Sequence, residues 1–231
     1  MTNIHFLGID LFWYLLALAF LLPRIPIVGK FFNIINTLFH ELGHAFMALL
    51  LQGEVTKIQI FSDTSGVTVT KSKSAVAAFF ISLAGYPFAS IAAYIAWYLM
   101  KYHFAMWFIL GLSLLFLIIL IFFIRNIYGI IWVLLFTALN GFLIFYFKND
   151  RYLEIAATFY ALSMLIESIW SPIVLLYLSF THPEQAGDAA NLKNITHIPA
   201  FFWALLFVVF SGLVTYYIIY MIFIPIFSVS I

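Results

Sequence analysis

Residues 31–52 read FFNIINTLFHELGHAFMALLLQ, an apolar segment with His40, Glu41 and His44 near its centre. An apolar stretch of about 20 residues is long enough to cross the hydrocarbon core of a bilayer as a helix. Polar side chains inside such a helix are costly, so they usually face the protein interior. The segment therefore predicts a membrane helix that turns a polar face toward partner groups in the same molecule.

The composition of the whole chain agrees with a membrane location. Of the 231 residues, 66% are hydrophobic and 8% are charged, and the formal net charge is +1. A typical soluble domain is about 45–50% apolar and about 25% charged. So few charges exclude a soluble enzyme, a nucleic-acid-binding protein and a disordered chain. The chain has no cysteine, so any metal site must use His, Asp or Glu side chains.

Apolar stretches recur along the chain and predict its architecture. We expect them at about 4–22, 31–52, 75–99, 104–124, 127–147, 152–180 and 198–227. They predict an all-α polytopic membrane protein with about six to seven transmembrane helices, forming one integral membrane domain over residues 1–231. Its expected location is the cell membrane, in direct contact with lipid.

The first stretch and the loop charges bear on processing and orientation. No Lys or Arg precedes the first stretch and Asp10 interrupts it, so we expect a retained helix rather than a cleaved signal peptide. The ten basic residues divide evenly between the two sides of the expected helices, which leaves the membrane orientation open. The oligomeric state is also left open.

Two segments depart from the helical pattern. Residues 54–71, EVTKIQIFSDTSGVTVTK, alternate apolar and polar side chains on both sides of the turn signal at Asp63–Gly66. This pattern predicts a short β-hairpin directly after the 31–52 helix. Residues 181–197, THPEQAGDAANLKNITH, form the longest polar stretch, and we expect a short helix to begin near Asp188.

His40-Glu41-Leu42-Gly43-His44 is an HExxH pattern. On a helix, positions i and i+4 lie on one face, so the two imidazoles can bind one zinc ion while Glu41 reaches a water beside it. Random placement of these residue types would give the pattern roughly 0.003 times in such a chain. The alternative is a structural cluster in which Glu41 hydrogen-bonds the two histidines.

A catalytic zinc needs a third protein ligand in addition to the two histidines. The residue types and spacing leave these candidates: Asp188, Glu184, His182, His197 and Glu167. Asp188 also suits a helix N-cap.

Glu167 is either a functional intramembrane carboxylate or lies near a helix end and reaches the interface or a serine hydroxyl. Asn191 either hydrogen-bonds a developing oxyanion or has a surface or capping role.

Three motifs resemble those of the site-2 protease family of intramembrane zinc metalloproteases. They are HELGHAFMALLLQGEVTKIQI at 40–60, SLAGYPFASI at 82–91 and GDAANLKNITHIPAFFW at 187–203. The third is similar to the version found in small bacterial members, although Ala189 follows Asp188 where glycine is usual. The resemblance implies that His40, His44 and Asp188 bind Zn²⁺ and that Glu41 is the catalytic acid/base.

The resemblance predicts a zinc metalloendopeptidase that hydrolyses peptide bonds of membrane proteins or membrane-associated peptides. Two alternatives stay open: a membrane protein that binds or transports zinc, and a non-catalytic relative that binds membrane partners. In a protease the 54–71 hairpin either receives an unwound substrate segment as an added strand or covers the active site.

Overall fold

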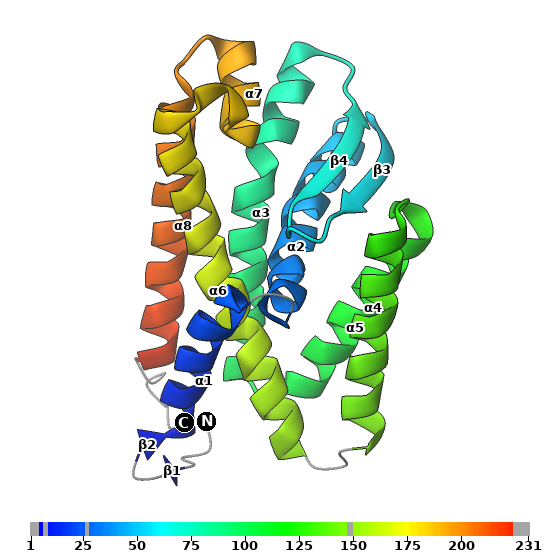
Figure 1. Cartoon of the computed structure of the whole chain (residues 1–231), viewed down its shortest axis with the longest axis vertical. Coiled ribbons are helices and arrows are strands. Elements are labelled where there is room, and N and C mark those ends of the chain that lie inside the picture. The colour runs from blue at the N-terminus through cyan, green and yellow to red at the C-terminus, as the bar shows by residue number, and fades with distance from the viewer. Residues whose placement is uncertain (1–4, 7–8, 26–27, 147–149, 224–231) are drawn as a thin grey trace, which may run out of the picture.

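The computed structural model describes residues 5–6, 9–25, 28–146 and 150–223. Most of this part of the chain is helical, and the longer helices run roughly along the long axis of the molecule (Figure 1). The helices are α1 (Leu11–Leu21), α2 (Val28–Leu50), α3 (Ala75–Lys101), α4 (Ala105–Phe122), α5 (Ile127–Tyr146), α6 (Asp150–Thr181), α7 (Gly187–Thr196) and α8 (Ala200–Phe223). The strands are β1 (His5–Phe6), β2 (Ile9–Asp10), β3 (Glu54–Ile60) and β4 (Gly66–Lys71), and the 3-10 turns are η1 (Leu22–Arg24) and η2 (Pro183–Gln185).

Within the described residues, five helices are long and apolar enough to cross a membrane, namely α3, α4, α5, α6 and α8. The predicted multi-pass, all-α membrane architecture is confirmed. The first two predicted stretches differ from expectation, because α1 and η1 form a bent pair with α2 at an angle of 92°. Counting that pair as one span gives up to six spans among the described residues, the lower end of the predicted six to seven. Residues 4, 7–8, 147 and 224–227 of the predicted stretches lie outside the description.

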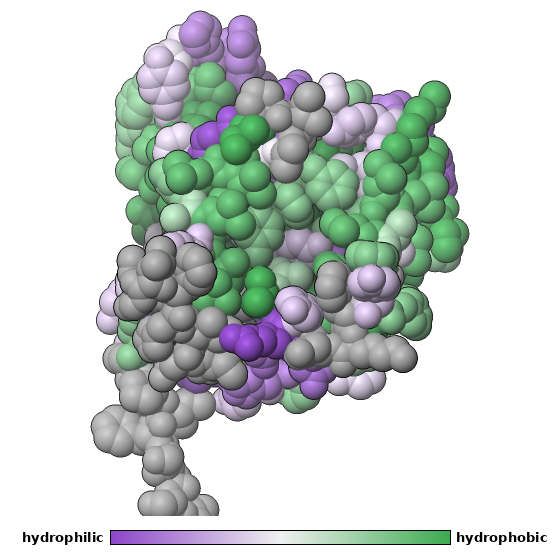
Figure 2. Space-filling view, turned by 60° about the horizontal axis from the view of Figure 1, so that its bottom comes forward, coloured by the Kyte–Doolittle hydropathy of each residue, from purple (hydrophilic) through white to green (hydrophobic). Residues whose placement is uncertain are grey.

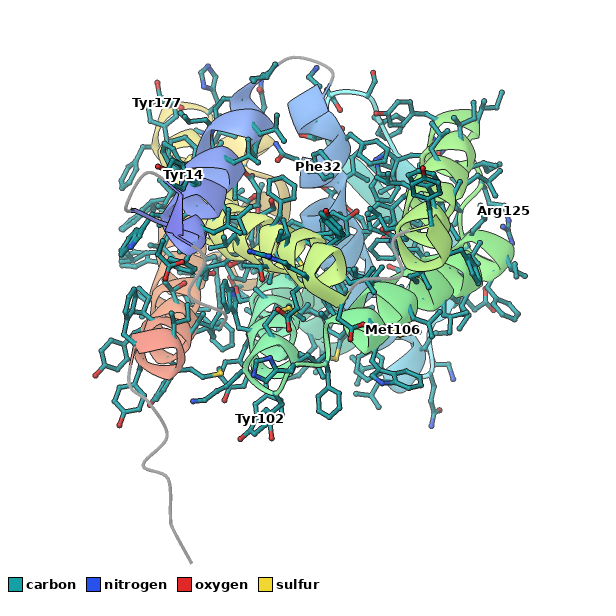
Figure 3. All side chains as sticks on the ribbon, turned by 90° about the horizontal axis from the view of Figure 1, so that it is seen from below. Tyr14, Phe32, Tyr102, Met106, Arg125 and Tyr177 are labelled. Carbon is teal, nitrogen blue, oxygen red and sulfur yellow. The ribbon has the colours of Figure 1, made fainter. Side chains whose placement is uncertain are left out.

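Apolar side chains cover the flank of the helices, as a membrane protein requires. Figure 2 shows hydrophobic residues across most of the visible flank and hydrophilic residues gathered toward its edges. Viewed from below, Phe32 lies inside the bundle, whereas Tyr102 and Arg125 lie at its rim (Figure 3). Phe32 packs edge-to-face on Phe159 of α6, with ring centroids 4.9 Å apart. The aromatic residues of the interior thus tie α2 to α6.

Helices α2 and α3 approach each other closely at Gly43. A Cβ atom placed on Gly43 would lie 2.6 Å from the Cβ of Phe88 and 2.9 Å from the carbonyl oxygen of Ala84. Small residues at such crossings let two membrane helices pack backbone to backbone. This contact fixes the central part of α3 against the histidine-bearing part of α2.

The predicted hairpin is confirmed as the antiparallel pair β3–β4, with Ile58 opposite Thr68. The other edge of β3 is already occupied, because the Ile58 amide donates to the Phe123 carbonyl at 2.8 Å and the Arg125 amide donates to the Ile58 carbonyl at 3.2 Å. Asn126 adds a side-chain bond to the Ile60 carbonyl at 2.6 Å. The hairpin is therefore held between α2 and the α4–α5 connection, with β4 as its outer strand on the side away from residues 123–125.

Candidate metal centre

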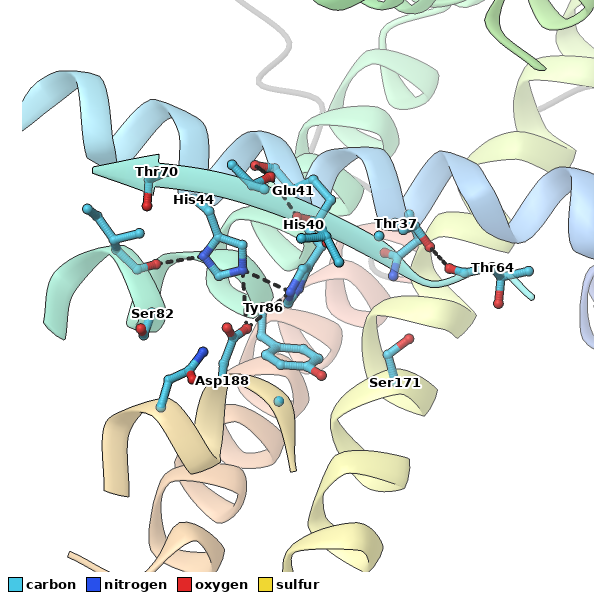
Figure 4. Close-up of a pocket in the computed structure, with 17 residues that line it drawn as sticks. Thr37, His40, Glu41, His44, Thr64, Thr70, Ser82, Tyr86, Ser171 and Asp188 are labelled. Atoms are coloured by element: carbon cyan, nitrogen blue, oxygen red, sulfur yellow. Dashed lines mark hydrogen bonds and ion pairs between the residues drawn. The ribbon is translucent and has the colours of Figure 1, made fainter. Parts of the chain in front are cut away.

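Three potential ligands from two distant segments meet in one place. His40 and His44 lie one turn apart on α2, with their Nε2 atoms 3.0 Å apart. Asp188 Oδ2, from the first turn of α7, lies 3.1 Å from His40 Nε2 and 3.2 Å from His44 Nε2 (Figure 4). Two imidazole nitrogens and one carboxylate oxygen thus form a nearly equilateral triangle.

The size of this triangle fits a tetrahedral zinc ion. With zinc–ligand distances near 2.0–2.1 Å, two ligands of a tetrahedral site are separated by about 3.3 Å. The observed separations of 3.0, 3.1 and 3.2 Å are close to that value. Nitrogen and carboxylate oxygen donors are also the ligand types that zinc accepts in catalytic sites, where a fourth position stays open.

A hydrogen bond orients His44 for this role. Its Nδ1 lies 2.7 Å from the carbonyl oxygen of Ile81 on α3. A carbonyl only accepts, so Nδ1 is the donor, and Nε2 is the ring nitrogen that faces His40 and Asp188. Outer contacts of this kind fix the tautomer and orientation of metal-binding histidines.

Gly85 of α3 leaves the space that the two imidazoles occupy. A Cβ atom on Gly85 would lie 2.5 Å from His40 Cε1 and 2.6 Å from His44 Nε2. The next residue, Tyr86, packs its ring edge-to-face on His40 with a centroid distance of 4.5 Å. The segment that resembles a family motif therefore lies directly against the histidine pair.

Asp188 does not have the capping role that was its alternative interpretation. Helix α7 begins at Gly187, and its N-cap residue is Ala186, with no side-chain capping bond. Burial alone would raise the pKa of the Asp188 carboxyl, but the adjacent His44 and His40 hold that pKa below its usual range. Ala189 is fully buried, so a methyl group fits where glycine is usual in the resembling motif.

Glu41 lies on a different side of α2 and faces the hairpin. Its carboxylate Oε2 accepts a hydrogen bond from Thr68 Oγ1 of β4 at 2.6 Å, and only 4% of the residue surface is exposed. Gly66 of β4 packs against the same side chain, since a Cβ there would lie 2.6 Å from Glu41 Cγ and Oε1. Glu41 therefore makes no hydrogen bond to the two histidines, in contrast to the structural-cluster interpretation.

A comparison with models of protein families identifies a family with which this chain agrees. The model of a family described as peptidase M50B-like matches residues 11–218. The chain belongs to the peptidase M50B-like family. None of the curated proteins and none of the solved structures compared with it matches. The predicted relationship to the site-2 proteases is confirmed at the level of the family, which implies a metallopeptidase embedded in a membrane.

A polar cavity of about 490 Å³ surrounds the cluster in this M50B-like protein. The three potential ligands, Glu41 and Thr68 all line it. Further polar lining comes from Asn36, Thr37, Ser82, Ser171 and Asn191. Asn191 is exposed and lies on the cavity side of α7, as its spacing from Asp188 predicts. The cavity offers room and hydrogen-bonding partners for water inside an otherwise apolar bundle.

The remaining third-ligand candidates lie outside the cluster that the described residues form. Glu167 is buried near the middle of α6, where Arg24 Nη1 donates to its Oε1 at 3.0 Å. The expectation that it lies near a helix end is wrong, because more than ten residues of α6 follow it and more than ten precede it. Its partner Arg24 belongs to the η1 turn. Glu184 pairs with Lys193, and His197 forms the left-handed C-cap of α7.

Sequence reasoning did not assign Thr68, Gly66 or Gly85 a role in the site. The sequence predicted only a turn position for Gly66 and only a strand position for Thr68. Alternation along residues 66–70 does group Gly66 and Thr68 on one face. However, it gives no information about which residue that face contacts.

Proposed function

We propose that this chain is an intramembrane zinc metalloprotease that hydrolyses peptide bonds of membrane-associated proteins. His40, His44 and Asp188 would bind the zinc ion, and Glu41 would act as general acid and base. The observation that carries the proposal is the triangle of ligand atoms with edges of 3.0–3.2 Å. Because α2, α3, β4, α6 and α7 all line its cavity, we also propose that residues 1–231 work as one membrane-embedded unit.

When bound, zinc supplies Lewis-acid polarisation of the scissile carbonyl and makes a water molecule more acidic. Glu41 lines the same cavity as the ligand triangle, one residue after His40. Its Oε2 is engaged by Thr68, whereas Oε1 accepts no hydrogen bond from the described residues. Oε1 is therefore the atom that would take the proton of the attacking water and later pass it to the leaving amine.

The position of the site along the helices supports access of water from one side. At 1.5 Å per residue, Gly85 lies about 15 Å from the Ala75 end of α3 and about 24 Å from the Lys101 end. The Ala75 end is also where α7 lies (Figure 1). With a hydrocarbon core of about 30 Å, the nearer route for water runs from the α7 end through the polar cavity.

The hairpin supports binding of an extended substrate on β4. Residues 123–125 hydrogen-bond to the edge of β3 that does not pair with β4. The remaining edge of this sheet therefore belongs to β4. Val67, Thr68 and Thr70 of β4 line the cavity. An extended peptide pairing with that edge would lie beside the ligand triangle with its backbone released from a helix. This favours strand addition over a purely covering role.

The test compares the purified wild-type protein with Glu41→Gln and Asp188→Ala in lipid vesicles. Zinc content is measured by mass spectrometry, and cleavage is measured on a panel of fluorescent single-span membrane proteins. We expect one zinc per chain and cleavage for the wild type, zinc without cleavage for Glu41→Gln, and loss of both for Asp188→Ala.

Two results would contradict the proposal. Intact zinc binding in Asp188→Ala would reject this residue as the third ligand. Zinc flux into vesicles that persists in Glu41→Gln, without cleavage of any panel member by the wild type, would favour the transport alternative.

A further inference from the structure

One hydroxyl group of the hairpin lies within hydrogen-bonding distance of two oxygens of α2. Thr68 Oγ1 lies 2.6 Å from Glu41 Oε2 and 3.1 Å from the carbonyl oxygen of the same residue. A threonine hydroxyl has a single proton to donate. The shorter of the two distances identifies the carboxylate oxygen as the acceptor of that proton, since strong O–H···O hydrogen bonds are short.

Gly66, two residues earlier on the same strand, restricts Glu41 from another direction. Its missing side chain leaves the space taken by Glu41 Cγ and Oε1. A glutamate side chain otherwise rotates about three bonds, and its helix fixes only its Cα–Cβ direction. Backbone contact at Gly66 and the hydroxyl of Thr68 therefore hold this carboxylate in one orientation.

We propose that Thr68 is a positioning residue for the general base of this enzyme. By holding Oε2, its hydroxyl leaves Oε1 as the oxygen that meets the attacking water. The proposal rests on the proposed function of Glu41. It also connects that function to the substrate, because the strand that orients Glu41 is the strand whose free edge would receive the peptide. Pairing of a substrate with β4 would then fix the base and the scissile bond on one rigid support.

The experiment measures kcat and KM separately for Thr68→Val, Thr68→Ser and Thr56→Val on a substrate that the wild type cleaves. Valine keeps the branched shape of threonine and removes the hydroxyl, whereas serine keeps the hydroxyl. Thr56 lies on β3 with an exposed side chain and provides the same chemical change in the same hairpin. Zinc content and thermal unfolding show whether each variant is folded.

We expect Thr68→Val to lower kcat by about tenfold to a hundredfold, the range for loss of one hydrogen bond to a charged group. KM and zinc content should change little, Thr68→Ser should retain most of the wild-type kcat, and Thr56→Val should match the wild type. A folded Thr68→Val with wild-type kcat would overturn the proposal. Equal losses in the valine and serine variants would also overturn it, because a packing defect would then explain both.

Failure of this proposal is distinguishable from failure of the proposed function. If Glu41→Gln abolishes cleavage while Thr68→Val leaves kcat unchanged, Glu41 acts without the help of Thr68. If Glu41→Gln cleaves as well as the wild type, the general-base assignment itself is wrong.

Discussion

Replacement of Gly85 by alanine tests the metal centre without altering any proposed ligand. The added methyl group would lie 2.5 Å from His40 Cε1, 2.6 Å from His44 Nε2 and 2.7 Å from His40 Nε2. Non-bonded carbon atoms prefer separations of about 3.5–4.0 Å. Both imidazoles, or the segment of α3 that bears the methyl, must therefore move by about 1 Å.

A shift of this size is large for a metal site. Metal–ligand distances are generally conserved within about 0.2 Å, so about 1 Å takes the nitrogens out of the bonding range. Loss of an outer contact alone typically lowers metal affinity by about 10–100-fold. Because the methyl group of Gly85→Ala crowds two ligand nitrogens directly, we expect zinc affinity to fall by at least about 100-fold.

The assay is a zinc titration against a competing chelator, with the detergent-purified wild type and variant compared. Gly212→Ala on α8 is the matched control, because a Cβ there meets nothing within 4 Å. Helical content and thermal unfolding of the zinc-free proteins show whether both variants are folded. A folded Gly85→Ala with wild-type zinc affinity would refute the inference that His40 and His44 bind the metal in this geometry.

Further predictions concern the base, the buried ion pair and the metal. Gly66→Ala crowds Glu41 Cγ and Oε1, so metal analysis should find normal zinc while cleavage falls about tenfold or more; undiminished cleavage would contradict the packing. Arg24→Met leaves Glu167 buried without its partner and should lower the free energy of unfolding by about 1–3 kcal/mol, with zinc affinity unchanged. Thermal unfolding measures this loss, and Arg24→Met combined with Glu167→Leu should recover most of it. Chelation of the metal should abolish cleavage and added zinc should restore it; cleavage that persists after chelation would argue against a zinc enzyme.

Local features of this protein follow well from its sequence because they depend on short-range geometry. The spacing of His40 and His44 places both on one helix face, and the structure has them one turn apart. The turn at Asp63–Gly66 and the alternation around it predict the observed hairpin. In both cases the residues that decide the structure lie within a few positions of one another.

Features that depend on contacts between distant segments were harder to predict from the sequence. Spacing alone left Asp188 among several candidates, and only the family resemblance singled it out, because its partners lie on α2, far away in the chain. Hydropathy likewise predicted a full first span, whereas α1 has 11 residues and bends with η1 away from α2. Hydropathy reports how favourably a segment enters the membrane, and it contains no information about the direction that the chain takes there.

The arrangement around α2 separates two tasks that HExxH patterns combine. Successive residues of a helix are rotated by about 100°, so Glu41 and the histidine pair face different neighbours. The histidines face Gly85 of α3, and Glu41 faces Gly66 of β4; in both places a neighbouring backbone approaches where a side chain would collide. Substitution of the two glycines should therefore have distinct effects, with Gly85→Ala reducing zinc affinity and Gly66→Ala reducing turnover at full zinc occupancy. If both variants lost zinc to the same extent, α3 and β4 would not support separate functions.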